Sequence, residues 1–156
     1  MSVVGKPRSY YKQFAFTIEI PGIQFTGFQK CGEIKGEVAT IEQWEGGALA
    51  AEKSPGRYKA ADVTLERGAT KDKDLWKWWK QVSNIAANQG AVDDTYKRTL
   101  DVVQRDRDGT ELCRWTLHDA WPNAFVAGQW DNTADANVME SVTLVYKYFD
   151  TEDEAS

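Results

Sequence analysis

The sequence predicts an α+β domain that is mainly antiparallel β, with a curled sheet or barrel-like sandwich and one flanking helix. Several stretches alternate apolar and polar residues, and this period of two indicates a strand with one buried face. Only one stretch shows the three- and four-residue spacing of an amphipathic helix. A tally of about six strands to a single helix is typical of this fold class.

A single domain is expected over residues 1–156, because a chain of this length buries ~68–70% of its unfolded surface. The aromatic content of 12%, with seven tryptophans, is typical of a folded chain. Four of the 24 acidic residues form an acidic tail over 150–156, which leaves 20 acids and 19 bases in residues 1–149. This nearly neutral body lacks the basic stripe with which proteins bind nucleic acid.

The first residues carry bases beside two tyrosines, and residues 1–12 are expected to form an N-terminal arm. No apolar run approaches the ~18 residues of a membrane span. The N-terminus also lacks the apolar segment of a signal peptide. We therefore expect synthesis and assembly in the cytoplasm, without a membrane anchor.

The first strand is predicted from Phe14 to Ile20, with its phenylalanines and isoleucines on one face. Pro21-Gly22 has the composition of a tight turn and leads into residues 23–28. An extended stretch with loose alternation follows from Ile34 to Trp44.

From Glu45 to Lys59 the periodicity is lost, and a loop of this length is usually functional or disordered. Gly46-Gly47 adds flexibility, while the run from Ala48 to Ala51 is apolar. This combination indicates an arm that is loose in the monomer and ordered against a partner. An ordinary surface loop is the alternative interpretation.

Pro55-Gly56 predicts a second tight turn, followed by a strand over 60–67. The helix is predicted from Asp72 to Asn88, with acids at its start and Gly90 beyond its end. Its apolar spacing predicts a broad buried face formed by Leu75, Trp78, Trp79, Val82, Ile85 and Ala86.

A hairpin is predicted next, with arms at 96–104 and 112–118 joined by a type I′ turn at Asp108-Gly109. Residues 120–125 are not expected in a central strand, because Pro122 lacks a backbone donor. The final strand is predicted from Val138 to Phe149, with one face formed by Val142, Leu144, Tyr146 and Tyr148.

Groups suited to catalysis or metal binding are scarce, so neither an enzyme nor a cofactor or metal site is predicted. His118 is the only histidine and is interpreted as a surface or interface residue. Cys31 and Cys113 are too far apart for a CxxC motif and are expected as buried thiols, with an intersubunit disulfide as the alternative. Tryptophans and lysines interleave over 76–80, but their helical spacing favours core packing over base stacking.

Three central segments carry a resemblance: Pro55-Gly56-Arg57-Tyr58-Lys59, then VTLERG over 63–68, then KDKDLWKWW over 71–79. The flanking segments FAFTIEIPG, at 14–22, and Ala-Trp-Pro, at 120–122, extend it. Together they resemble the tail tube protein family of contractile phage tails and extracellular contractile injection systems, over roughly residues 12–149.

This resemblance implies a structural subunit. Six copies would close into a ring whose joined sheets form a larger continuous barrel, and rings would stack into a hollow inner tube. The implied partners are other copies, a contractile sheath outside, baseplate or tube-initiator proteins, and DNA or protein cargo that passes without specific binding. The implied location is a virion tail or an extracellular injection particle. The sequence fits either one, and fits a main subunit, an initiator or a cap paralogue.

The resemblance also makes 45–59 the inter-ring loop, with the candidates Trp44, Glu45, Gly46, Gly47, Leu49, Lys53, Pro55, Gly56 and Arg57. Strands with unpaired edges, a liability in a monomer, would be completed by neighbouring copies. Alternation alone suggests the lumen-facing candidates Thr17, Glu19, Glu37, Thr40 and Glu66. The alternative function is a monomeric β-barrel that binds a small ligand in its mouth.

Overall fold

A computed structural model describes residues 15–23, 27–83 and 96–151. All strand pairs in these residues are antiparallel, which confirms the predicted α+β class. The elements are β1 (Phe16–Glu19), β2 (Phe28–Cys31), β3 (Gly36–Gln43), β4 (Glu52–Ala60), β5 (Val63–Gly68), α1 (Asp74–Ser83), β6 (Arg98–Arg105), β7 (Glu111–Val126), β8 (Met139–Val145) and β9 (Tyr148–Thr151). The predicted N-terminal arm at 1–12, the helix beyond Ser83 and the end of the acidic tail lie outside the described residues.

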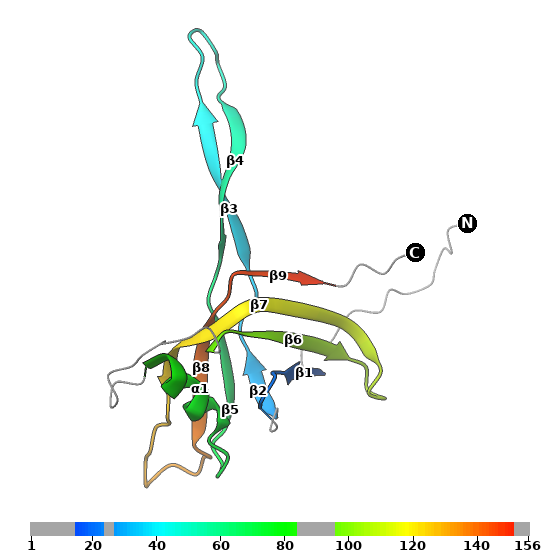
Figure 1. Cartoon of the computed structure of the whole chain (residues 1–156), viewed down its shortest axis with the longest axis vertical. Helices are drawn as coiled ribbons and strands as arrows, with labels where there is room; N and C mark the ends of the chain where they lie inside the picture. The colour runs from blue at the N-terminus through cyan, green and yellow to red at the C-terminus, as the bar shows by residue number, and fades with distance from the viewer. Residues whose placement is uncertain (1–14, 24–26, 84–95, 152–156) are drawn as a thin grey trace, which may run out of the picture.

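The main sheet has seven strands in the order β1-β6-β7-β8-β5-β2, and β9 pairs with β7. The long strand β7 bends and belongs to both halves of this sheet (Figure 1). Its first half pairs with β6 and β9, and its second half pairs with β8. We call β1, β6, the first half of β7 and β9 the β6 layer, and the second half of β7, β8, β5 and β2 the β5 layer.

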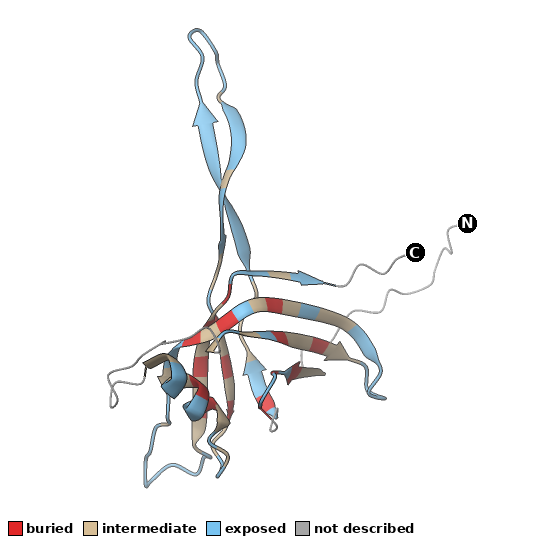
Figure 2. Ribbon diagram, in the orientation of Figure 1, coloured by how far each residue is buried: buried red, intermediate tan, exposed pale blue. Residues whose placement is uncertain are grey.

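The hydrophobic core lies between these layers, and the residues coloured as buried in Figure 2 lie on strands of both layers and on the helix. Alternate residues of each strand supply it, as the period of two predicts. The helix adds Leu75 and Trp78, and the Trp78 indole Nε1 donates to the Tyr96 carbonyl oxygen at 2.6 Å. The other core residues are Ile18, Ile20, Ile23, Phe28, Val63, Leu65, Leu100, Leu117, Ala120, Val142, Leu144 and Tyr146.

The start of the helix follows the predicted acids, because Asp72 Oδ1 accepts from the Asp74 backbone nitrogen at 3.1 Å. Trp78 is buried as predicted, whereas Trp79 is only half-buried. The strand predicted at 60–67 is β5, but Ala60 ends β4 instead. Ala61 lies in the connection, where its backbone nitrogen donates to the Lys35 carbonyl oxygen.

Two turns show how glycine sets the backbone. The turn at Pro21-Gly22 is confirmed, with Gly22 at φ 82° and the Ile23 nitrogen donating to the Ile20 oxygen. The type I′ turn at Asp108-Gly109 is wrong, because only Gly109 has a positive φ, at 90°. Hydrogen bonds from Gly109 to Asp106 and from Asp106 to Thr110 instead define a three-residue hairpin loop with a glycine bulge.

The second half of β7 is an edge segment, as its proline predicts. Pro122 is paired only with β8 among the described strands, next to a register shift before Ala124. Asp119, with φ 54°, marks the bend between the two halves. Its neighbour His118 accepts at its carbonyl oxygen from the Lys147 nitrogen, opposite the break between β8 and β9.

That break corrects the prediction for the final strand. Tyr148 does not share the buried face of Val142 and Leu144; it is exposed, and Phe149 packs against the core instead. The inward and outward positions therefore exchange after Tyr146. β9 continues to Thr151, so the predicted acidic tail begins within a strand at Asp150.

Strands β3 and β4 form a separate two-stranded hairpin that stands away from the body (Figure 1). We call residues 36–60 the arm. The extended stretch predicted at 34–44 is confirmed as β3, but the unstructured loop predicted at 45–59 is wrong from Glu52 onward. Pro55-Gly56 is not a turn: it lies within β4 beside a register shift between Val38 and Thr40. A Cβ on Gly56 would lie 3.1 Å from the Ala39 oxygen.

Candidate assembly interfaces

The arm exposes both of its faces, and in its two strands only Gly56 and Ala60 are half-buried (Figure 2). Five large apolar side chains of the arm are exposed to solvent, and Leu49 is fully exposed. They are Val38, Ile41, Trp44, Leu49 and Tyr58. A lone two-stranded hairpin is at best marginally stable, and such apolar exposure marks an interaction site. The arm therefore has the properties of a segment that is completed by a partner.

Cross-strand pairs hold the arm together. Register places Glu37 opposite Lys59 and Glu42 opposite Lys53, so opposite charges face each other. At its base Lys35 Nζ lies 2.6 Å from Glu37 Oε1, and this hydrogen bond lowers the pKa of the Glu37 carboxyl below its ordinary value.

The predicted inter-ring residues all lie in the arm or at its tip. The tip, residues 44–51, contains Trp44, Glu45, Gly46, Gly47 and Leu49. It turns at Gly47, with φ 84°, where the Ala48 nitrogen donates to the Glu45 oxygen at 3.0 Å. The remaining candidates are on β4: Lys53, Pro55, Gly56 and Arg57.

The β6 layer has two open edges. In the described ranges, no strand pairs with the outer edge of β1 or of β9. Because each neighbouring pair from β1 through β6 and β7 to β9 is antiparallel, the two edge strands run in opposite directions. The first and last strands in the order of the main sheet, β1 and β2, do not pair with each other, so the sandwich is not a closed barrel.

The side of the β6 layer that faces away from the core carries a charged network, which we call the polar face. Arg114 binds three carboxylates: its Nη1 lies 2.9 Å from Glu19 Oε2 and 2.5 Å from Asp101 Oδ2, and its Nε lies 2.6 Å from Glu111 Oε1. These bonds, led by that to Glu19, raise the pKa of the Arg114 guanidinium above its ordinary value. The positive charge of Arg114 on the polar face is therefore paired with carboxylates.

Further polar groups extend the polar face over three strands. Arg105 Nε donates to Thr17 Oγ1 at 3.0 Å and its Nη2 to Glu19 Oε1 at 3.4 Å. Val103 of β6 is paired with Thr17 of β1 on one side and with Arg114 of β7 on the other. It is fully buried although it lies on the polar face. The charged side chains thus also cover apolar surface.

His118 occupies the β9 end of the polar face. Its Nε2 lies 3.1 Å from Asp150 Oδ2, and its ring stacks on Tyr148 with a centroid distance of 4.3 Å and an angle of 16°. The side chain is partly exposed, as expected for a surface or interface residue.

The predicted lumen candidates are divided among three places. Thr17 and Glu19 lie together on the polar face, whereas Glu37 and Thr40 belong to the arm. Glu66 lies on β5, in the other layer. Alternation missed Asp101, Arg105, Arg114 and Thr116, whose partners are on strands distant in sequence.

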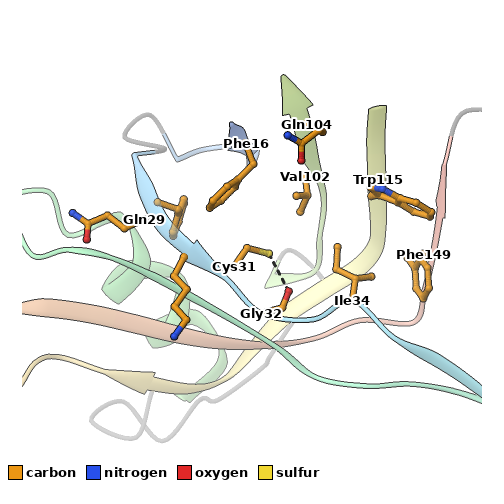
Figure 3. Close-up of a pocket in the computed structure, with 11 residues that line it drawn as sticks. Phe16, Gln29, Cys31, Gly32, Ile34, Val102, Gln104, Trp115 and Phe149 are labelled. Atoms are coloured by element: carbon orange, nitrogen blue, oxygen red, sulfur yellow. Dashed lines mark hydrogen bonds between the residues drawn. The ribbon is translucent and has the colours of Figure 1, made fainter. Parts of the chain in front are cut away.

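A cavity of about 880 Å³ opens between the layers near the base of the arm (Figure 3). We call it the interlayer groove; its apolar lining is Phe16, Phe28, Ile34, Val102, Trp115 and Phe149. Cys31 also lines it, donating from Sγ to the Gly32 oxygen, and burial raises the pKa of this thiol to about 11. Neither cysteine is in a disulfide, and both are half-buried and not fully buried as predicted.

Two classes of feature are missing from the part of the chain that the structure describes. No group of three or more histidine, cysteine, aspartate or glutamate side chains there is arranged to hold a metal ion. Nor is any described helix long and apolar enough to cross a membrane.

The sequence matches the family model of the T4-like virus tail tube protein gp19 over residues 12–150. The fold is similar to a chain in the anti-feeding prophage cap, the tube terminating cap (TM-score 0.79, 20% identity, 97% of this chain and 99% of that one). It is also similar to a chain in the sheath-tube complex of the PVC extracellular contractile injection system (TM-score 0.73, 21% identity, 96% and 93% covered). No curated protein matches the sequence.

Proposed function

Because this chain belongs to the T4-like virus tail tube protein family, we propose that six copies close into a ring and that rings stack into a hollow inner tube. The chain is a structural tube subunit and not a small-ligand barrel. The observation that carries the proposal is the pair of open edges on the β6 layer, together with an arm that contacts little of its own body.

The open edges support ring closure. Rotation about a ring axis keeps strand directions, so β9 of one copy meets β1 of the next as an antiparallel pair. Each copy then contributes four strands to one continuous barrel, and the β6 layer keeps no open edge. On the core side of this seam Phe16 of β1 would meet Phe149 of β9, and contact between them would bury apolar surface that is partly exposed in the single chain.

The polar face supports a lumen through which cargo slides. A wall that gripped DNA would need free lysine and arginine, since phosphate binding depends on them. Here Arg105 and Arg114 are bound to acids of the same face. DNA or protein cargo would then pass without specific binding, with Thr17 and Glu19 among the residues that line its path.

The arm supports stacking of rings. Eight residues of β3 span ~26 Å, so the arm reaches well beyond its own body. A heterologous contact made by each arm repeats by translation and forms a filament. Stacking would also bury the exposed apolar side chains of the arm.

Outside this tube we expect a contractile sheath, and at its end baseplate or initiator proteins. The chain would assemble in the bacterial cytoplasm and end in a virion tail or an extracellular injection particle. This structural role requires no catalysis and no cofactor.

The test is assembly of the purified full chain. Electron microscopy of concentrated protein is expected to show six-fold rings and stacked tubes, and deletion of residues 46–51 should leave rings but abolish long tubes. A variant in which glycine and serine replace residues 46–51 at equal length separates loss of side chains from shortening of the tip. A strictly monomeric wild-type chain would contradict the proposal, and long tubes from the deletion variant would contradict the role of the arm.

A further inference from the structure

A second groove lies at the end of the molecule opposite the arm tip, beside the connection between β7 and β8 at the bottom of Figure 1. Its volume is about 510 Å³. We call it the pole groove; the residues that matter here are Glu66, Val126, Trp130, Asp131 and Val138. Trp130 is 70% exposed and Val126 is 52% exposed, so two large apolar side chains at its rim lie in water. Exposed aromatics at a groove are typical anchors of protein interfaces.

The pole groove is preformed. Gly128, with φ 149°, lets the connection pass close beneath Val138 and Trp130, since a Cβ there would lie 2.5 Å from Val138 Cγ1. Asp131 Oδ1 accepts from the Thr133 nitrogen at 2.9 Å and from its hydroxyl at 2.7 Å. The Val138 oxygen accepts from the Ala69 nitrogen at 2.8 Å. A site held in this way loses little conformational entropy when it binds.

The arm tip and the pole groove both present exposed apolar side chains. The tip presents Trp44 and Leu49, whereas Lys53 and Lys59 of β4 lie opposite acids of β3. The residues lining the pole groove include Glu66 and Asp131 and no lysine or arginine. Neither lysine nor arginine occurs in the sequence between Arg114 and Lys147. Apolar contact between the tip and the exposed Trp130 and Val126 at the rim of the groove would therefore favour docking.

From these observations we propose that the arm tip of each copy docks in the pole groove of a second copy in the next ring. The inference rests on the proposed tube. When all arms point the same way, an arm meets the side of the next ring that faces away from that ring's own arms, and the pole groove lies on that side (Figure 1).

The interlayer groove is the rival site, and its position argues against it. It is lined by Ile34, which precedes β3, and by Phe149, whose ring lies 3.1 Å from the Cβ position of Gly36. It therefore opens at the base of the arm. In head-to-tail stacking, the tip from the ring below reaches the side of a ring that faces away from that ring's own arms. The interlayer groove does not lie on that side.

Cysteine cross-linking in assembled tubes tests the docking. In a Cys113→Ser background, Leu49→Cys combined with Ala134→Cys is expected to give covalent ladders longer than dimers after oxidation, because every copy supplies one tip and one groove. Mixed tubes of the two single variants should stop at dimers. The comparison variant joins Leu49→Cys with Lys30→Cys, an exposed position at the interlayer groove.

The cross-linking result tests the docking, and tube formation by the wild-type chain tests the proposed function. Tubes that form but cross-link through residue 30, or through neither site, overturn the docking and leave the tube intact. Absence of tubes from the wild-type chain overturns the proposed function, and the docking with it.

A second measurement uses matched tryptophan substitutions. Trp130→Ala should raise the protein concentration needed for tube growth by about 30-fold, the effect of losing one anchor residue. Its thermal unfolding should be unchanged, because the side chain is mostly exposed. Trp76→Ala, which removes another exposed tryptophan outside the pole groove, should leave tube growth near the wild-type value. Wild-type growth of Trp130→Ala, or equal loss in both variants, would overturn the assignment.

Discussion

Arg67 and Glu140 form a buried ion pair across β5 and β8, with Arg67 Nε 2.5 Å from Glu140 Oε1. Both residues continue the inward face of their strands, beyond Leu65 and Val142. The guanidinium also lies over the Phe28 ring, 5.6 Å from its centroid. The pair therefore lies at the edge of the apolar core. Each charge compensates the other, because either one alone would be a buried charge without a partner.

This pair predicts strongly unequal effects of single and double substitution. Arg67→Met should lower the free energy of unfolding by ~3–5 kcal/mol, because it leaves the Glu140 carboxylate buried and uncompensated. Arg67→Met with Glu140→Leu should recover most of that loss. Urea unfolding of dilute, unassembled protein measures both. Equal destabilisation of the single and double variants would show that the charges are not coupled.

Reactivity of Cys31 should follow its raised pKa. With a thiol pKa of about 11, only ~0.1% is thiolate at pH 8, and the rate of alkylation should rise about tenfold for each unit of pH up to that value. Mass spectrometry after iodoacetamide treatment measures the rate at each cysteine. In urea the protection of Cys31 should disappear; rapid alkylation of Cys31 in folded protein at pH 8 would contradict the burial.

Arg114 should stabilise the β6 layer through its three carboxylates. Arg114→Ala is expected to cost about 1–2 kcal/mol, a value reduced for the partial exposure of its partners. Lys147→Ala, at an exposed position, should change stability by less than ~0.5 kcal/mol. The readout is thermal unfolding at low and high salt. A loss for Arg114→Ala as small as that for Lys147→Ala would refute the role of the network.

Two glycines give a matched test of local packing. Gly128→Ala should destabilise by about 1–3 kcal/mol, because its φ disfavours a side chain and the new Cβ collides with Val138. Gly46→Ala meets nothing within 4 Å at the arm tip and should be nearly neutral. Calorimetric midpoints of the two variants provide the comparison, and a neutral Gly128→Ala would mean that the connection can shift.

Sequence patterns predicted the elements that are buried on one side. In β5 the alternation that places Val63 and Leu65 inward arises from that burial, and it was visible in the sequence. In β4 both faces meet water, so burial imposes no period of two, and the sequence from Glu52 therefore resembles that of a loop. Alternation places Tyr148 on the wrong face, because the break opposite Asp119 changes which positions point inward and no local residue signals that break.

The polar face depends on strand order, which local patterns do not contain. Glu19 and Arg114 meet because β1 lies beside β6 and β6 beside β7, although the two residues are far apart in sequence. Alternation could show that Thr17 and Glu19 point away from the core. It could not show that arginines from other strands would neutralise them.

The two unlike edges of the β6 layer have a kinetic consequence for the proposed ring. An arc of any length still offers one free β1 at one end and one free β9 at the other, so unfinished arcs remain adhesive and keep recruiting copies. The circle alone has no end to offer. Closure is then self-terminating, and curvature set by the bent strand β7, more than subunit supply, fixes the number of copies at which growth around the ring stops.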